Sequence, residues 1–284
     1  MSTATTLTSK KMQSVESIAI GGFDGMHRGH QHLFAELGEN GAIVVIESGY
    51  ANLTPARERE AYSVYPILYL ELDTIRHLDG KAFIAFLQEQ FVHLKKIVVG
   101  YDFYFGKDRK YSFNDLKTLF DGEVKVVQEV TYNGDSVHSH KIRQKLLDGD
   151  IEGANNFLGH HYMLKGKHIK GQGIGSKELV ATLNIVTEGF LIPKDGVYAT
   201  LTQLDDEEHR YPSITFIGKR ESTDGTFAIE THILGTKVAT KEKISISFIS
   251  YIRENRKFER LEQLKEMIQK DIAIATKKLQ MLQL

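Results

Sequence analysis

The chain of 284 residues has no cysteine, no tryptophan and only four prolines. Without cysteine it forms no disulfide and offers no thiolate to a metal ion, which fits a reducing cytoplasm. It also lacks any apolar run near the roughly 18 residues that a membrane span needs, and its first residues lack the apolar core of a signal peptide. We therefore expect a soluble, cytoplasmic protein with no membrane partner.

An excess of charge of one sign is missing too. The 36 Lys and Arg residues nearly balance the 37 Asp and Glu residues, so the formal net charge is −1 at pH 7. This balance excludes a global positive field that recruits nucleic acid and leaves room only for a compact basic groove. We expect small-molecule ligands and no nucleic-acid partner, and the oligomeric state stays open.

A glycine-rich turn between Gly21 and Gln31 carries the clearest chemical pattern. The apolar run Ile18–Ile20 before it is typical of a buried strand, and the residues after it have helical spacing. Glycines at such a turn let the backbone approach a phosphate, and the helix N-terminus offers N–H donors. His27 and His30 stand at the mouth of that helix, where imidazoles can bind a polyphosphate. The alternative is an ordinary turn with two solvated histidines.

Strands and helices alternate from residue 16 to residue 150, which predicts a doubly wound, Rossmann-like α/β domain. Its strands are expected at Ile18–Ile20, Ala42–Ile46, Ile97–Val99 and Val124–Val130, and its helices include Lys81–His93 and one capped by Ser112. Ligands bind such sheets beyond the carboxyl ends of the strands. The aromatic loop from residue 100 to residue 106 lies there, either as a pocket wall or packed on the core.

The second half of the chain has a different texture. Residues 151–160 read as a helical linker, and short strand-like runs without intervening helices then predict a small antiparallel β-barrel over residues 161–284. These runs are Tyr162–Ile169, Val197–Leu204, Ser213–Ile217, Phe227–Leu234 and Ile244–Tyr251. An amphipathic helix from Phe258 to the C-terminus should pack on the barrel. Residues 1–15 are expected to be a flexible tail.

Taken together, these residues resemble the bifunctional bacterial riboflavin kinase/FAD synthetase family. In the first half the likeness rests on three stretches, Gly22–Gln31, Leu53–Pro55 and Val99–Gly106, and the first of them also resembles the signature of the nucleotidyltransferase superfamily. The resemblance implies an FMN adenylyltransferase domain in which His27 and His30 are catalytic. It implies binding roles for Gly22, Phe23, Asp24, Gly25, Gly29, Asp102, Phe103, Ser139 and Arg143.

In the second half the likeness rests on a glycine loop, Gly171–Gly175, followed by Thr182-Leu183-Asn184, Glu230-Thr231-His232 and Ile252–Phe258. The resemblance implies a riboflavin kinase domain in which Gly171, Gly173 and Gly175 bind nucleotide. Thr182 and Asn184 would hold Mg²⁺ and the phosphates of ATP. Glu230 would take the proton from the ribityl hydroxyl of riboflavin, a role that suits a carboxylate.

The implied function is ATP-dependent phosphorylation of riboflavin to FMN, followed by adenylylation of FMN to FAD with release of pyrophosphate. Several positions depart from the family pattern. His138 and His140 stand where hydroxyl residues are usual, Ala181 replaces a proline, and the segment after Phe216 lacks an asparagine. These departures keep two alternatives open: a monofunctional FMN adenylyltransferase with an inactive barrel, and a non-catalytic protein that senses flavin or nucleotide.

Overall fold

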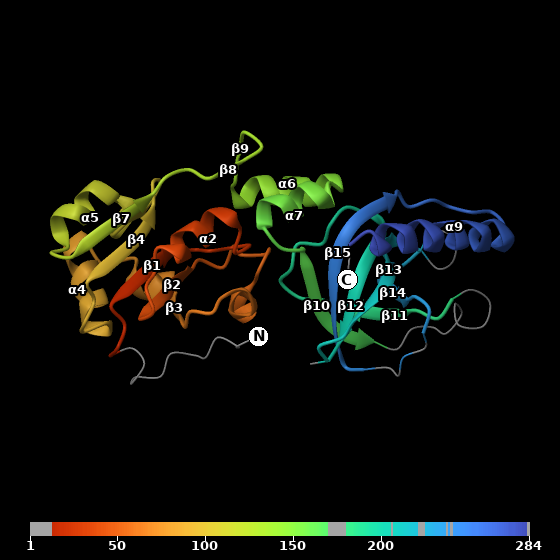
Figure 1. Cartoon of the computed structure of the whole chain (residues 1–284), viewed down its shortest axis with the longest axis horizontal. Helices are drawn as coiled ribbons and strands as arrows, with labels where there is room; N and C mark the ends of the chain where they lie inside the picture. The colour runs from red at the N-terminus through yellow and green to blue at the C-terminus, as the bar shows by residue number, and fades with distance from the viewer. Residues whose placement is uncertain are drawn as a thin grey trace. The chain divides into compact units, whose positions relative to one another are not determined.

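The computed structural model of the chain describes residues 13–169, 180–205, 207–220, 225–236, 238 and 241–282. The chain divides into two compact units, Met1–Ser139 and His140–Leu284, each with its own sheet (Figure 1). In the parts that the structure describes, no helix is long and apolar enough to cross a membrane. The sequence places the linker between the domains at residues 151–160, and that boundary stays a prediction.

The first unit is built on a five-stranded parallel sheet with the strand order β3-β2-β1-β4-β7. The central strand β1 pairs with β2 on one side and with β4 on the other, so the chain reverses its direction of winding between β1 and β4. The strands are β1 (Ser17–Gly21), β2 (Gly41–Glu47), β3 (Ile67–Glu71), β4 (Lys96–Gly100) and β7 (Glu123–Val127).

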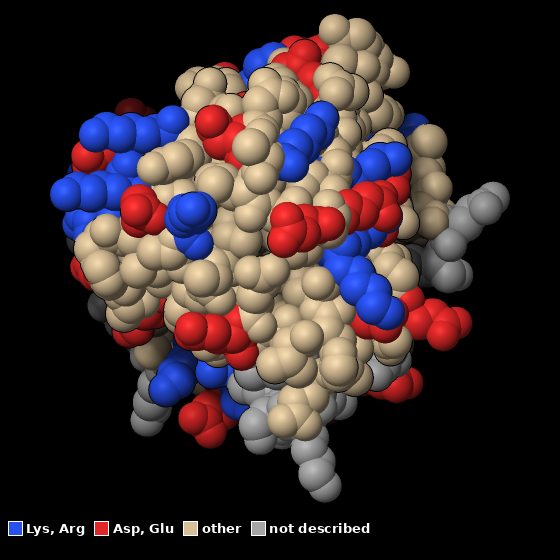
Figure 2. Space-filling model, turned by 90° about the vertical axis from the view of Figure 1, so that its left-hand side faces the viewer, with Lys and Arg blue, Asp and Glu red and all other residues tan. Residues whose placement is uncertain are grey.

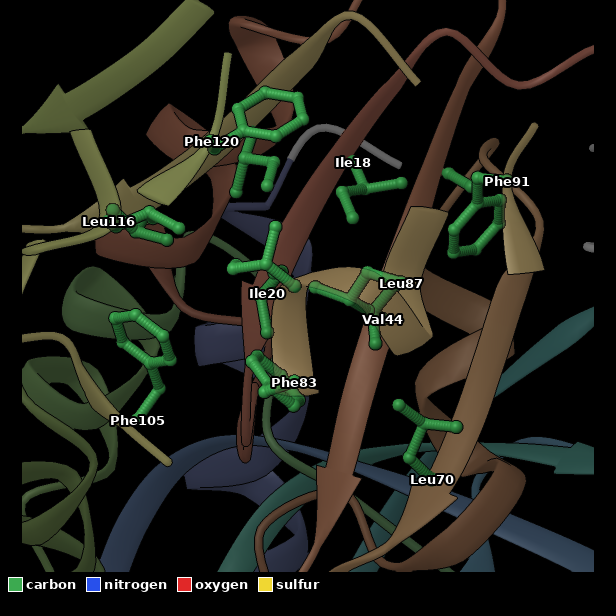
Figure 3. Packing of buried hydrophobic residues seen from close by; sticks show 14 of the residues in the cluster. Ile18, Ile20, Val44, Leu70, Phe83, Leu87, Phe91, Phe105, Leu116 and Phe120 are labelled. Atoms are coloured by element: carbon green, nitrogen blue, oxygen red, sulfur yellow. The ribbon is translucent and has the colours of Figure 1, made fainter. Parts of the chain in front are cut away.

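Both faces of this sheet are buried, because successive side chains of each strand point to opposite sides. Ile18 and Ile20 of β1 join the core cluster that contains α4 and α5, whereas Ala19 joins the cluster that contains α2. Figure 3 shows the first cluster, with Ile20 beside Phe83 and Val44 beside Leu87. The predicted doubly wound sheet is therefore confirmed. The helices are α2 (Arg28–Ala35), α3 (Leu72–Ile75), α4 (Gly80–Gln90) and α5 (Phe113–Leu119).

Local signals in the sequence fix where these helices begin. The Asp79 carboxylate accepts a hydrogen bond from the Ala82 N–H at the start of α4, and Ser112 and Asp115 form the predicted capping box of α5. Short elements complete the unit: η1 (Ala56–Tyr62), η2 (Lys107–Arg109), and the paired strands β5 (Tyr104–Phe105) with β6 (Tyr111–Ser112) and β8 (Thr131–Tyr132) with β9 (Asp135–Ser136).

The second unit contains α6 (Ser139–Asp148) from His140 onward and α7 (Ile151–Leu158), and it continues as a closed antiparallel barrel, as predicted. Its strands follow the order β10-β11-β14-β13-β12-β15. They are β10 (Met163–Ile169), β11 (Leu183–Val186), β12 (Gly196–Leu204), β13 (Arg210–Lys219), β14 (Phe227–Ile233) and β15 (Lys243–Arg253). The sequence pattern did not predict β11, because it has only four residues and half-exposed ends.

Hydroxyl groups fill part of the barrel interior. Thr200, Thr202, Ser213, Thr215 and Thr231 are fully buried and bond to one another at 2.8–3.1 Å. Each hydroxyl can donate and accept, so the cluster satisfies itself without water. The outer side chains of the same strands, such as Val197 and Ile214, pack against α9.

The C-terminal helix α9 (Leu261–Gln280) lies along the outside of the barrel (Figure 1). Its inner face contributes Ala275 and Leu279 to the apolar cluster. One charged group on that face is also buried: the Asp271 carboxylate, 4% exposed, accepts from Nε and a terminal nitrogen of Arg253 at 2.8–2.9 Å. This paired fork fixes α9 against the end of β15.

The surface carries both signs of charge in close mixture, as Figure 2 shows for one face. On the first unit, Lys96 lies 3.4 Å from Glu123, and Lys125 lies 3.3 Å from Glu36. Such exposed pairs contribute little to stability. They are consistent with the near-zero net charge of the whole chain.

We predict that Asp271→Ala lowers the free energy of unfolding by about 3 kcal/mol, because it leaves the Arg253 guanidinium, mostly buried, without its carboxylate. Urea unfolding followed by circular dichroism measures this change. The matched control is Glu152→Ala, which removes an exposed partner of Lys278 and should change the value by less than about 0.5 kcal/mol. Equal effects of the two variants would contradict the role given to the Asp271 pair.

Candidate active sites

The turn between β1 and α2 has an unusual backbone. Phe23, Gly25 and Met26 all have positive φ angles, +48°, +88° and +44°. Only glycine adopts this region freely, so the other two need support from their surroundings. Phe23 and Met26 supply that support by burying their side chains in the core beside α2. The turn is thus held in one shape at the carboxyl edge of the sheet.

The Asp24 carboxylate ties this turn to the segment after β2. It accepts hydrogen bonds from the backbone N–H groups of Asn52, Leu53 and Thr54 at 2.9–3.2 Å. In return the Thr54 hydroxyl accepts a bond from the Gly25 N–H at 2.8 Å. Two of the stretches that carry the family resemblance, Gly22–Gln31 and Leu53–Pro55, are therefore in contact. Asp24, which was predicted to bind the ligand, joins them through these hydrogen bonds.

Ser139 also reaches this turn. Its hydroxyl donates to the Asp24 carbonyl oxygen at 2.8 Å, although the two residues are 115 positions apart. The structure therefore brings Ser139 to the signature turn. Arg143, predicted with it, lies on α6 in the second unit, and its role stays a prediction.

The two histidines of the signature stack on each other at the N-terminus of α2. Their ring centroids are 3.5 Å apart and their planes differ by 20°. His27 is the N-cap residue, and a side chain at Gly29 would come within 3.2 Å of its ring, so Gly29 makes room for it. A Cβ on Gly22, in contrast, would meet no atom within 4 Å, which leaves space beside the turn for a ligand.

Burial lowers the pKa of His30 well below its usual value, and the nearby His27, Arg59 and His138 add to this shift. His30 is therefore neutral at pH 7, with one ring nitrogen as donor and the other as acceptor. Its ring edge also contacts Phe23. A neutral, fixed imidazole at the N-terminus of a helix can donate a hydrogen bond to a phosphate oxygen.

Sequence reasoning missed Arg59, which is 1% exposed and lies beneath this turn. Its guanidinium donates to a Glu47 carboxylate oxygen at 2.6 Å and to the Gly22 carbonyl oxygen at 3.2 Å. In the sequence Arg59 belongs to a charged segment, and the side chains of such segments normally lie in solvent. Its partner Glu47 is the last residue of β2.

The aromatic loop after β4 divides its side chains between core and solvent. Phe103 stacks on the buried Phe105, and both join the core cluster on one face of the sheet. Asp102 is exposed at the carboxyl end of β4, the same edge that carries the signature turn. Its ligand role, like that of Phe103, stays a prediction. Beside it, the Tyr101 hydroxyl donates to Glu129, which also contacts His138 at 3.1 Å.

A pocket of about 180 Å³ lies between the outer face of the barrel and α9. Its walls are apolar at Val197, Ile214 and Phe216 from the barrel and at Leu264 and Ile268 from the helix. Polar and charged residues line the rest of it: Thr182, Arg220, Glu230, His232, Arg253, Asn255, Arg256 and Asp271. A flat apolar ligand with a polar or charged tail matches this lining.

Two of the predicted barrel residues, Thr182 and Glu230, line this pocket, and Asn184 lies next to Glu230. Asn184 and Glu230 are directly opposite each other on β11 and β14, and Thr182 precedes β11. Arg220 joins the two: its Nε lies 3.1 Å from a Glu230 carboxylate oxygen, and its terminal nitrogen donates to the Asn184 amide oxygen at 3.1 Å. Sequence reasoning did not single out Arg220. Gly171, Gly173 and Gly175 lie outside the described residues.

Two family models match the chain and divide it between them. The model described as FAD synthetase matches residues 9–46 and 56–141, and the model described as riboflavin kinase matches residues 158–279. Together they span most of both units.

Curated relatives match over nearly the whole length. The bifunctional riboflavin kinase/FMN adenylyltransferase of Listeria monocytogenes is 30% identical, over 89% of each chain. The protein of the same name from Escherichia coli K12 is 27% identical, over 89% of this chain and 90% of its own. A crystal structure named as a macrolide-efflux protein from Streptococcus pneumoniae is 27% identical, with a TM-score of 0.80 over 93% of this chain and 94% of that one.

We predict that His30 makes the first unit sensitive to acid. Because the pKa of His30 is lower when the protein is folded, the unfolded chain binds a proton more readily below pH 6.5, and stability falls as the pH drops through that value. Urea unfolding measures the free energy of unfolding at pH 7.5 and pH 5.5. Between these two values it should fall less for His30→Gln than for the wild type. The control His32→Gln removes an exposed imidazole from the same helix and should keep the wild-type loss. A full loss in His30→Gln would contradict the prediction.

Proposed function

The chain belongs to the bifunctional riboflavin kinase/FMN adenylyltransferase family, and we propose a division of labour among its own residues. The barrel unit phosphorylates riboflavin to FMN with ATP, and the α/β unit adenylylates FMN to FAD and releases pyrophosphate. The observation that carries the proposal is the stacked pair His27 and His30 at the N-terminus of α2, on a turn that Asp24 holds in place.

In the α/β unit the FMN phosphate attacks the α-phosphorus of ATP, and the bond from that phosphorus to the pyrophosphate oxygen breaks. No covalent nucleophile is needed, because such transfers depend on positioning and on stabilising charge. His27 and His30 would donate to the phosphate oxygens on which charge develops. Gly22 and Gly25 would let the backbone approach the nucleotide, and Asp102 and Phe103 would frame its pocket.

In the barrel unit the apolar walls of the pocket suit the ring system of riboflavin, and the polar side suits its ribityl chain. Glu230 would take the proton of the terminal hydroxyl as its oxygen attacks the γ-phosphorus of ATP, and the bond from that phosphorus to the bridging oxygen would break to release ADP. Arg253 and Arg256 line the same pocket and offer positive charge to phosphate oxygens. Arg253 keeps its orientation through Asp271.

ATP with Mg²⁺ is part of this proposal, with Thr182 and Asn184 as the expected ligands. In the present arrangement they do not fit a metal ion, because the Asn184 amide oxygen accepts a hydrogen bond from the Arg220 guanidinium. Among the described residues there is also no group of three or more His, Asp or Glu side chains placed to hold a metal. The roles proposed for the barrel therefore belong to its own side chains.

The pairing of Arg220 with Glu230 favours one second candidate, the monofunctional FMN adenylyltransferase with an inactive barrel. In this pairing the Glu230 carboxylate contacts a guanidinium in the place where the candidate kinase would have it contact a substrate hydroxyl. This candidate makes FAD from supplied FMN and no FMN from riboflavin. A cytoplasmic location and purely small-molecule substrates belong to either candidate and rest on the composition of the chain.

We predict reciprocal defects from two isosteric substitutions. His27→Gln should slow FAD formation from FMN by about 100-fold or more while leaving FMN formation from riboflavin unchanged, because it removes a donor at the developing charge. Glu230→Gln should slow FMN formation by about 100-fold or more and spare FAD formation, because it removes the base. Chromatography of flavins after single incubations with ATP and Mg²⁺ measures both rates.

The matched control is His209→Gln, an exposed histidine remote from either set of residues in the sequence, which should leave both rates unchanged. Loss of both activities in either variant would contradict separate sites. An unchanged rate of FMN formation in Glu230→Gln would remove Glu230 from the mechanism.

A further inference from the structure

Arg220 stands between Asn184, to which the family resemblance gives a role in binding Mg²⁺ and phosphate, and Glu230, to which it gives a catalytic role. Asn184 and Glu230 are cross-strand partners on β11 and β14, so their side chains leave the sheet side by side. Arg220 follows the last residue of β13 and reaches across both, with one nitrogen 3.1 Å from the amide oxygen and another 3.1 Å from the carboxylate.

The backbone around Arg220 holds it in that position. Its N–H donates to the Thr226 carbonyl oxygen at 2.9 Å, and its own carbonyl accepts from the Gly225 N–H at 3.1 Å. These bonds join Arg220, which follows β13, to the residues just before β14. The backbone of Arg220 is therefore held by hydrogen bonds. Its guanidinium can leave Asn184 and Glu230 by a movement of the side chain alone.

The guanidinium of Arg220 contacts two oxygen atoms that a metal ion could also bind. An amide oxygen and a carboxylate oxygen are the hard donors that Mg²⁺ and Mn²⁺ choose. Arg220 offers them a permanent positive charge, since arginine does not lose its proton in proteins. Its side chain is 21% exposed and that of Glu230 is 22% exposed, so water screens this contact only partly.

We propose that Arg220 is an internal cation that competes with a divalent metal ion for Asn184 and Glu230. With the guanidinium in place, the oxygen pair is closed to the metal and the carboxylate is held by a positive charge. With the guanidinium displaced, the same pair opens toward the pocket. The barrel thus has a built-in restraint on metal binding. The inference rests on the proposed function, which gives Asn184 to the metal and Glu230 to the reaction, but it concerns metal affinity and not turnover.

The test is the affinity of the full chain for Mn²⁺ alone, without nucleotide or flavin, measured from the electron paramagnetic resonance signal of free Mn²⁺. Arg220→Gln keeps the length and polarity of the side chain and removes its charge. It should bind Mn²⁺ about tenfold more tightly than the wild type, the scale of one charge-assisted hydrogen bond. Circular dichroism verifies that each variant is folded.

Two comparisons make the test specific. Arg256→Gln removes another positive charge from the same pocket without touching Asn184 or Glu230 in the described contacts and should change the affinity by less than about twofold, as expected for a screened charge. Adding Glu230→Gln to Arg220→Gln should abolish the gain, because the carboxylate is then missing.

An unchanged Mn²⁺ affinity in Arg220→Gln would overturn the inference. An equal gain in Arg256→Gln would also overturn it, since it would show a general effect of charge. A gain that survives the addition of Glu230→Gln would place the metal elsewhere and overturn it too. Failure of the proposed function gives a different result: FMN formation would persist in Glu230→Gln while the effect of Arg220 on Mn²⁺ is retained.

Discussion

The α/β unit depends on one buried carboxylate. Asp24 gathers three backbone N–H groups of residues 52–54 and thereby joins the turn after β1 to the segment after β2. The turn has positive φ angles at Phe23 and Met26, a shape that needs such support. With the turn fixed, the N-terminus of α2 and its two stacked imidazoles face the carboxyl edge of the sheet. Catalysis by positioning requires this kind of rigidity.

The barrel unit uses a different balance of forces. Hydroxyl groups satisfy one another inside it, and an apolar seam outside it binds α9. The pocket lies in that seam, so the strands supply Ile214, Phe216 and Glu230 and the helix supplies Leu264 and Ile268. Three guanidinium groups enter the same pocket, and two of them are paired with carboxylates: Arg253 with Asp271 and Arg220 with Glu230. The first pair fixes the helix, and the second restrains the base.

The sequence was most informative where local patterns decide structure. The apolar runs Ile18–Ile20 and Ala42–Ile46 predicted strands buried on both faces, and the capping box at Ser112 predicted a helix start. What it missed depends on contacts between distant residues. Arg59 lies in a charged segment and becomes buried only because Glu47 pairs with it. Strand β11 is too short for a periodic pattern and exists because β10 and β14 flank it.

The central claim is that one chain carries both steps on separate units, and a time course with two starting flavins tests it most directly. The wild-type protein with excess ATP and Mg²⁺ should convert riboflavin first to FMN and then to FAD, and should convert supplied FMN to FAD without delay. FAD from FMN with no product from riboflavin would contradict the kinase role of the barrel. Flavin binding with no product from either start would contradict catalysis altogether.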